Sequence, residues 1–158
     1  MTATIISIDE LRDAVGHEVA VSDWITVSQT VIDEFAEATR DAQWIHVDTE
    51  RAALESPFRD ARGRPCTVVH GFLTLSLLTH IIESCLRITG VRAGTNVGFE
   101  RVRFITPVPA GSRLRGHFGL VKLEDVRGGV QLTWLVSIEL EGEMRPALTA
   151  EWLTLLLL

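Results

Sequence analysis

The chain has 158 residues, of which 46% are hydrophobic and 23% charged, and its formal net charge is −6. This length fits a single domain over residues 1–158. An acidic chain without a run of Lys or Arg argues against nucleic acid as the main partner. Neither a secretory signal pattern nor an apolar stretch long enough to cross a bilayer is visible, so we expect a cytoplasmic protein without a membrane partner.

The first part of the chain is predicted to be mostly helical. Ser7 and Glu10 have the spacing of a capping box, which predicts a helix over residues 8–15 that ends at Gly16. β-Branched residues then predict a strand over residues 18–27. A second helix is predicted over residues 28–38, because apolar residues recur on one face: Val31, Ile32, Phe35 and Ala38.

A second group of helices is predicted further along the chain. Asp48 or Thr49 is a candidate cap for a short helix that ends near Leu54. Residues 56–65 contain Pro, Gly and mixed charges, which predict a loop. The segment 71–89 carries almost no charge, and this pattern predicts one long helix that is buried on most sides.

After Gly90 the pattern changes to strands and turns, with Gly and Pro between the apolar runs. The predicted strands are residues 97–105, 113–124, 130–141 and 145–158. Because they follow one another through short turns, we expect an antiparallel sheet. The predicted fold class is therefore α+β, with an antiparallel sheet wrapped around one buried helix.

Asp41 and His46 stand five residues apart in a short segment between two predicted helices. A carboxylate and an imidazole in one loop can divide proton transfer between them. Neighbouring Trp44 and Ile45 can limit access of solvent. The same spacing also fits a surface loop with an Asx cap and an incidental histidine, so spacing alone leaves both interpretations open.

His70 and Gly71 open the predicted apolar helix. Glycine lets a ligand approach the backbone closely, and the first N–H groups of a helix have no partner within it. A carbonyl oxygen that gains negative charge would be stabilised there. A helix start that uses glycine only for its turn is an equal alternative. Three hydroxyls follow at Thr74, Ser76 and Thr79, although most helical hydroxyls bond to carbonyls of their own helix.

The sequence offers little support for other kinds of chemistry. The five histidines are scattered without the spacing of a metal site, so we expect no metal. Walker, GxGxxG and GxSxG motifs are absent. Cys66 and Cys85 form no CxxC pair and are predicted to be free thiols, with a single bridge as the alternative.

The segment FAEATRDAQWIHVDTERAALESPF, followed by VVHGFLTLSLL, resembles the MaoC-like dehydratase family. The QWIH run indicates its nodulation protein N-like branch, which is related to the R-specific enoyl-CoA hydratases. The family pattern is an Asp, a His five residues later, and then His-Gly at the start of a long apolar helix. Asp41, His46, His70 and Gly71 match it. The later NVGFERVRFITPVPAGSRLRG resembles the strand pair that follows, so the resemblance runs from about Asp9 to the end.

This resemblance implies a hot-dog fold with a long central helix, and a homodimer whose sheets join. It implies hydration of a trans-2-enoyl thioester to the (R)-3-hydroxyacyl thioester, with no cofactor and with CoA or an acyl carrier protein as the carrier. The net charge of −6 mildly disfavours an acidic carrier. Asp41 and His46 would be the catalytic pair. The residues implied for the oxyanion and the substrate are Gly71, His70, Ser76 and Asn96.

Two departures from the family pattern bear on substrate choice: Arg40 stands where many relatives have Gly, and Val97 stands where an aromatic is common. Two other functions remain open. A hot-dog thioesterase would need a carboxylate on the central helix, where Glu83 is the only acid. A non-catalytic acyl-binding or dimer-partner subunit would have no use for both Asp41 and His46.

Overall fold

A computed structural model describes residues 3–158 of the chain. Strand β1 (Thr4–Ile6) leads into helix α1 (Ile8–Asp13). The Ser7 hydroxyl accepts a hydrogen bond from the Glu10 N–H at 3.2 Å, and the Glu10 carboxylate accepts one from the Ser7 N–H at 2.7 Å. The predicted capping box is therefore confirmed. The short strand β1 was not predicted.

The main sheet has six strands: β2 (Glu18–Val21), β3 (Ile25–Thr26), β5 (Ala93–Phe104), β6 (Arg113–Val126), β7 (Gly129–Leu140) and β8 (Leu148–Leu157). Their order is β2-β6-β7-β8-β5, with β3 also paired to β6, and every pairing is antiparallel. The predicted hairpins β6–β7 and β7–β8 are confirmed. Strand β5 lies beside β8 at one edge of the sheet, so the connection from β5 to β6 passes over the positions of β8 and β7.

The predicted strand over residues 18–27 is interrupted in the structure. Ser22 is fully buried, and its hydroxyl accepts a hydrogen bond from the Gly116 N–H at 2.9 Å. A side-chain oxygen therefore takes the place of a backbone carbonyl there, and regular pairing stops before β3 resumes it.

The central helix consists of two consecutive segments, α5 (Gly71–Ser76) and α6 (Leu78–Cys85). The prediction of one helix over residues 71–89 is wrong beyond Cys85. Leu86–Ile88 form strand β4, which pairs in parallel with β1. The prediction that this segment is buried on most sides is also wrong: Leu73, Leu78, Ile81 and Cys85 are buried along one face, whereas Phe72, Ser76, Thr79 and His80 are exposed. Backbone pairing with β1, 82 residues earlier in the chain, decided the conformation of residues 86–88.

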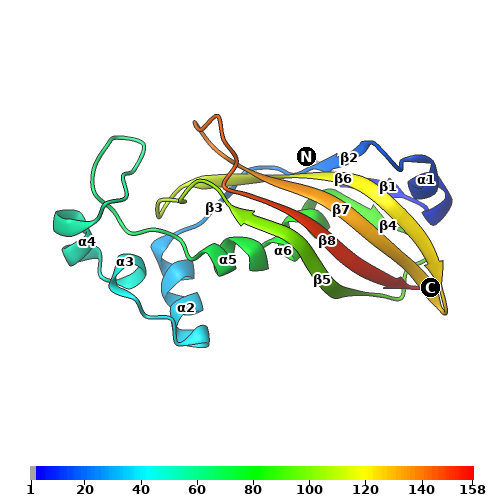
Figure 1. Ribbon diagram of the computed structural model, residues 1–158, viewed down its shortest axis with the longest axis horizontal. Helices are drawn as coiled ribbons and strands as arrows, with labels where there is room; N and C mark the ends of the chain where they lie inside the picture. The colour runs from blue at the N-terminus through cyan, green and yellow to red at the C-terminus, as the bar shows by residue number, and fades with distance from the viewer. Residues whose placement is uncertain (1–2) are drawn as a thin grey trace.

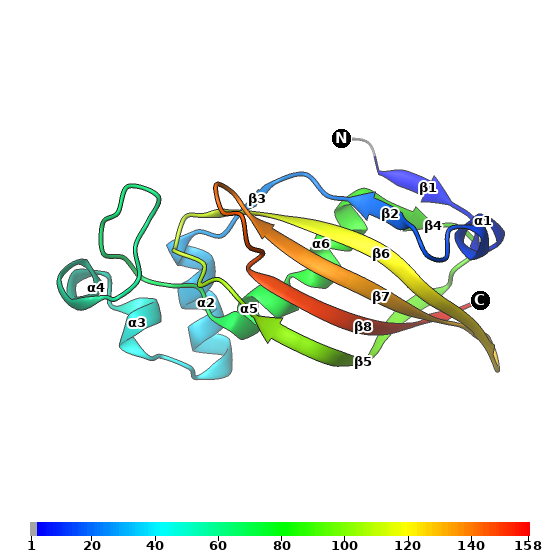
Figure 2. The ribbon, with the colours of Figure 1, turned by 45° about the horizontal axis from the view of Figure 1, so that its top comes forward.

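The sheet curves around α6, so its concave face and the helix form the core (Figures 1 and 2). Alternate residues of β7 and β8 are buried, as expected for strands with one face against a core. The helix lies close to the sheet, because a side chain of Ile81 occupies the space that a Cβ on Gly116 would need, at 2.6 Å. The predicted α+β class is confirmed.

Helices α2 (Gln29–Thr39), α3 (Trp44–Val47) and α4 (Thr49–Glu55) lie at one end of the sheet (Figure 1). Helix α2 buries Ile32 and Ala36, whereas Ala38, which was predicted on the buried face, is exposed. Asp48 caps α4 by accepting a hydrogen bond from the Arg51 N–H at 2.9 Å. This contact decides between the two predicted caps.

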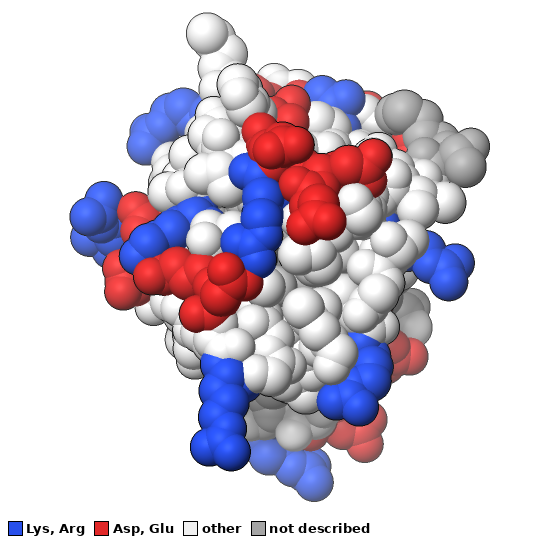
Figure 3. Space-filling view, turned by 90° about the vertical axis from the view of Figure 1, so that its right-hand side faces the viewer, with Lys and Arg blue, Asp and Glu red and all other residues white. Residues whose placement is uncertain are grey.

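The opposite end of the molecule carries interspersed charges of both signs (Figure 3). Arg12 of α1 forms an ion pair with Asp125 of β6, and Lys122 lies 2.8 Å from Glu124. Both cysteines are free, as predicted, with Cys85 buried and Cys66 half-buried. None of the helices in the described part of the chain has both the length and the apolar character needed to cross a membrane.

Candidate active site

The chain turns sharply between α2 and Asp41. Arg40 has φ 64° and ψ 19°, in the left-handed region. Glycine adopts this conformation freely, whereas another residue pays roughly 1–2 kcal/mol. The glycine that the family pattern implies at this position would adopt this conformation without strain. Arg40 adopts it here, and the turn returns the chain toward the start of the central helix.

This turn brings Asp41, His46 and His70 together from three separate segments. One oxygen of Asp41 and one ring nitrogen of each histidine all lie within 4.8 Å of one another. The Asp41 side chain is 51% exposed, whereas His46 is 8% and His70 is 2% exposed. The structure therefore unites the two residues predicted as an acid–base pair and adds a buried second imidazole.

The tautomer of His46 follows from its contacts. Its Nδ1 lies 2.6 Å from the Val68 carbonyl oxygen, which can only accept, so Nδ1 carries the proton. This leaves the lone pair of His46 on Nε2. Burial lowers the pKa of His46 and outweighs the hydrogen bond to Val68, which acts in the opposite direction. The ring is therefore suited to accept a proton near neutral pH.

Two polar residues that were not predicted as site residues fix the backbone at His46 in helix α3. The Gln29 amide donates to the His46 carbonyl at 2.7 Å, and its oxygen accepts from the Thr67 hydroxyl at 2.6 Å. Thr67 is 4% exposed. Nothing in the sequence links these positions, which are 38 residues apart, so only the folded structure reveals them.

His70 lies beneath the pair. Its Nε2 donates to the Asp41 carbonyl oxygen at 2.9 Å and lies 4.0 Å from the Asp41 carboxylate. Its ring stacks on that of His46, with centroids 3.7 Å apart and an angle of 23° between the planes. The side chain is 2% exposed, and these contacts join it to both members of the acid–base pair.

Gly71 is the first residue of α5, directly after His70. A Cβ at this position would lie 3.1 Å from two ring atoms of Phe104. The ring of Phe104 packs edge-on against Phe72, and both rings are at least half exposed. The space opened by the missing side chain is thus occupied by an aromatic ring. As the first N–H groups of a helix have no partner within it, the Gly71 N–H is not used by α5 itself.

The remaining predicted site residues have other contacts. The Ser76 hydroxyl donates to the Phe72 carbonyl at 2.7 Å, one turn back in the same helix. Asn96 lies on β5, where its oxygen accepts from the Trp152 Nε1–H at 3.1 Å. Val97 was expected to bear on substrate choice. It lies at a register shift of β5 with its side chain 52% exposed, whereas neighbouring Asn96 lines the pocket.

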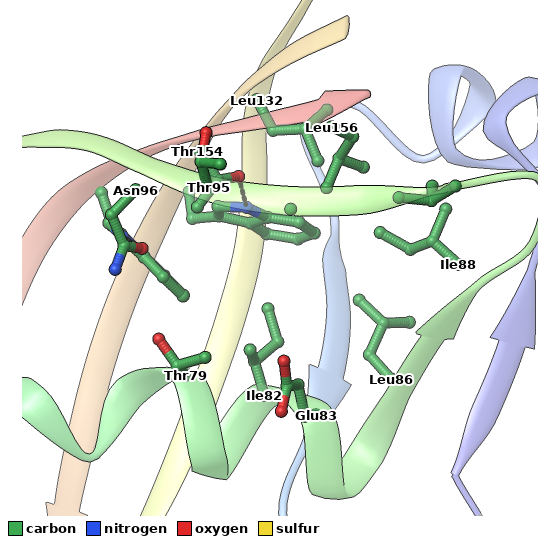
Figure 4. Close-up of a pocket in the computed structure, with 14 residues that line it drawn as sticks. Thr79, Ile82, Glu83, Leu86, Ile88, Thr95, Asn96, Leu132, Thr154 and Leu156 are labelled. Atoms are coloured by element: carbon green, nitrogen blue, oxygen red, sulfur yellow. Dashed lines mark hydrogen bonds between the residues drawn. The ribbon is translucent and has the colours of Figure 1, made fainter. Parts of the chain in front are cut away.

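That pocket is a cavity of about 250 Å³ between α6 and β4 on one side and the sheet on the other (Figure 4). Its wall is mostly apolar, with Ile82, Leu86, Ile88, Leu132, Leu156 and two tryptophans. The Trp134 Nε1–H donates to Thr154 at 3.0 Å, so this polar group is already satisfied. Thr79 and Glu83 of α6 also line it. The pocket is therefore suited to an apolar group.

The three clustered residues do not form a good metal site. A ligating nitrogen must be free of its proton, but His46 Nδ1 and His70 Nε2 both donate to carbonyl oxygens. The free nitrogen of His70 is Nδ1, which is buried in the protein. The arrangement favours proton transfer between side chains and a bound molecule.

The model of the MaoC like domain matches residues 10–139. The chain belongs to the MaoC-like dehydratase family. A nodulation protein N from Rhizobium leguminosarum bv. viciae is 47% identical over 154 residues, which cover 96% of this chain and 91% of that relative. A 3-hydroxyacyl-thioester dehydratase Z from Mycobacterium tuberculosis is 44% identical over 149 residues and covers 94% of both chains.

Solved structures of the MaoC-like family share the fold. A monoamine oxidase regulatory protein from Archaeoglobus has a TM-score of 0.71, 23% identity, and coverage of 99% of this chain and 98% of its own. The (R)-hydratase from A. caviae has a TM-score of 0.63, 21% identity, and coverage of 89% and 94%. The predicted hot-dog fold is confirmed. Family membership supports a hydro-lyase activity, which is the addition of water to a carbon–carbon double bond or the elimination of water to form one.

Proposed function

We propose that this protein hydrates a trans-2-enoyl thioester to the (R)-3-hydroxyacyl thioester and catalyses the reverse dehydration, with Asp41 and His46 as the acid–base pair. The observation that carries the proposal is the hydrogen bond from His46 Nδ1 to the Val68 carbonyl. It leaves Nε2 unprotonated, and one ring nitrogen of His46 lies within 4.8 Å of an Asp41 carboxylate oxygen. A single water molecule can bridge two groups about 5 Å apart, because each hydrogen bond spans roughly 2.8 Å.

The reaction needs one proton removed and one delivered. The water oxygen bonds to C3 while the pair accepts one of the water protons, and the C2=C3 electrons move toward the thioester oxygen. The pair then returns a proton to C2, so the enzyme ends unchanged. The Gly71 N–H, next to His70, would hold the thioester oxygen as its negative charge develops. No cofactor enters this scheme.

The thioester class is supported by the 44% identical relative, which is named a 3-hydroxyacyl-thioester dehydratase. CoA as the carrier and the (R) configuration are what the resemblance to R-specific enoyl-CoA hydratases implies. Net charge is −6, and this disfavours an acidic carrier protein, because like charges slow the encounter of two proteins. CoA thioesters are therefore the substrates to test first.

We infer that the acyl chain runs along the central helix into the cavity beside α6. Thr79, which lines this cavity, is eight residues from Gly71, which corresponds to about 12 Å at 1.5 Å per helical residue. An extended chain advances roughly 1.3 Å per bond, since three backbone bonds cover 3.8 Å. An acyl chain of about eight to ten carbons would reach the cavity, whereas a four-carbon chain would not.

We also propose that the protein is a homodimer joined through β5. Strand β5 pairs with β8 along one edge, and the described strand order leaves its other edge at the end of the sheet. A long unpaired edge normally finds a partner or is protected. The exposed side chains of Val97 and Phe104 on this strand would gain from burial.

The test is hydration of trans-2-enoyl-CoAs of four to twelve carbons, followed by loss of the enoyl absorbance. Asp41→Asn should lower kcat by at least about 100-fold, since general acid–base catalysis contributes that much or more. Asp125→Asn is the matched control, because Asp125 pairs with Arg12 at the far end of the sheet. It should keep full activity.

Other outcomes would separate the competing functions. Release of free CoA without formation of a hydroxyacyl product would indicate a thioesterase. Binding of acyl-CoA without turnover, unchanged in Asp41→Asn, would indicate a non-catalytic subunit. Absence of turnover of every enoyl-CoA by folded wild-type protein would refute the proposal for CoA substrates.

A further inference from the structure

His70 is the most buried polar side chain of the site, and its contacts reach both members of the acid–base pair. Its Nε2–H donates to the Asp41 carbonyl oxygen at 2.9 Å. One face of its ring stacks on His46 at 3.7 Å, and the Phe35 ring lies 5.1 Å away at 54°. The imidazole thus lies between Phe35 of helix α2 and His46 of helix α3.

The other ring nitrogen of His70 lacks a partner. Nδ1 is buried, and within the described residues it has no hydrogen-bond partner. Buried polar atoms are nearly always paired, so an unpaired one requires an explanation. A phenyl ring of similar size would fill this space without that cost. A polar ring at this position is explained if its function is to donate the Nε2–H hydrogen bond to the Asp41 carbonyl oxygen.

Asp41 needs such a contact because it follows a strained turn. Arg40 is held at φ 64°. A residue in this conformation persists only where surrounding contacts fix it. The His70–Asp41 hydrogen bond is the contact that joins the turn to the start of the central helix. The His70 carbonyl in turn accepts the Thr74 N–H at 3.1 Å, so the backbone of His70 is also fixed.

We propose that His70 is a positioning residue, which holds the Asp41 backbone through its Nε2–H and supports the His46 ring by stacking. This inference rests on the proposed function only in that Asp41 and His46 carry the chemistry. It replaces the expectation that the His70 side chain binds substrate. Loss of the Nε2–H would let Asp41 move relative to His46, while the substrate surface would remain.

Two substitutions separate the hydrogen bond from the filling of space. His70→Phe keeps a ring of similar size and removes the N–H donor. His70→Gln keeps an N–H donor near the position of Nε2 and removes the ring. We expect His70→Phe to lower kcat by about 100-fold with little change in KM, since a misplacement of about 1 Å has this effect. His70→Gln should remain within about tenfold of wild type.

A purely structural role predicts the opposite order. Phenylalanine would then be the better replacement, because glutamine leaves a buried amide only partly paired. Activity of His70→Phe equal to or above that of His70→Gln would overturn the proposal. A large rise in KM in both variants would also overturn it, because it would indicate direct contact with substrate.

A second measurement does not depend on turnover. Backbone amide hydrogen exchange of residues 41–46 should be faster in His70→Phe than in wild type, and close to wild type in His70→Gln. Equal exchange in all three proteins would overturn the positioning role, even if wild type hydrates enoyl-CoA. The expected exchange pattern together with an inactive wild type would support the positioning role and refute the proposed function.

Discussion

Replacement of Gly71 by alanine tests whether the start of α5 must hold its position for activity. The new methyl carbon would lie 3.1 Å from two ring atoms of Phe104. Carbon atoms pack best at about 3.5–4.0 Å, so helix and ring must separate by roughly 0.4 Å. A misplacement of 1 Å costs about 100-fold in rate, so 0.4 Å on the helix side corresponds to roughly sixfold.

Stability should not follow activity in this variant. Replacing glycine by alanine at a position with helical backbone angles lowers the entropy of the unfolded chain and adds about 0.4–1 kcal/mol, which offsets the strain against the ring. We therefore expect Gly71→Ala to unfold in urea at the wild-type midpoint or above it, while kcat/KM for enoyl-CoA hydration falls about five- to tenfold.

The control is the double variant Gly71→Ala with Phe104→Leu, compared with Phe104→Leu alone. The smaller side chain makes room for the methyl group, so the two effects should not add. Recovery of activity in the double variant would locate the cause in this contact. An unchanged loss in the double variant, or full activity of Gly71→Ala, would refute the reasoning.

Three further predictions concern pH, packing and buried hydrogen bonds. The acid limb of kcat/KM should have its midpoint below pH 6.5, because burial lowers the pKa of His46 and only the neutral ring accepts a proton. The unfolded chain binds this proton more readily than the folded one, so the free energy of unfolding should fall as pH drops below 6.5. A kinetic midpoint above pH 6.5 would contradict the lowered pKa on which both expectations rest. Gly116→Ala should lower the free energy of unfolding in urea by about 1–3 kcal/mol, because the new Cβ would lie 2.6 Å from a methyl group of Ile81 on α6. In the control Gly119→Ala on the same strand, the nearest atom is 3.7 Å from the new Cβ, so stability should change little. Thr154→Val should lose about 1–3 kcal/mol, since it leaves the buried Trp134 N–H unpaired; Thr154→Ser keeps the acceptor, and equal losses in the two variants would contradict this explanation.

Local signals in the sequence predicted local structure well. Ser7 and Glu10 form the expected capping box, since both partners lie within one turn of helix. Asp48 caps α4 for the same reason. The hairpins β6–β7 and β7–β8 were predicted correctly because glycines mark their turns. In each case the deciding contacts join residues a few positions apart.

Prediction failed where distant segments decide the backbone. Residues 86–88 are as apolar as the helix before them, yet they pair with β1. Strand β5 pairs with β8 in place of its neighbour in sequence. Periodicity describes which face of a segment is apolar, but it contains no information about a pairing partner far along the chain.

The sequence by itself determined the fold class and the membership of Asp41, His46, His70 and Gly71 in one motif. Only the tertiary structure decided how these residues relate to each other. The protonated nitrogen of His46 is fixed by the Val68 carbonyl, and the direction of the His70 ring is fixed by the Asp41 carbonyl. Both are contacts to backbone atoms more than 20 residues away. Backbone carbonyls are identical in every residue, so no sequence pattern can mark which one will accept the bond.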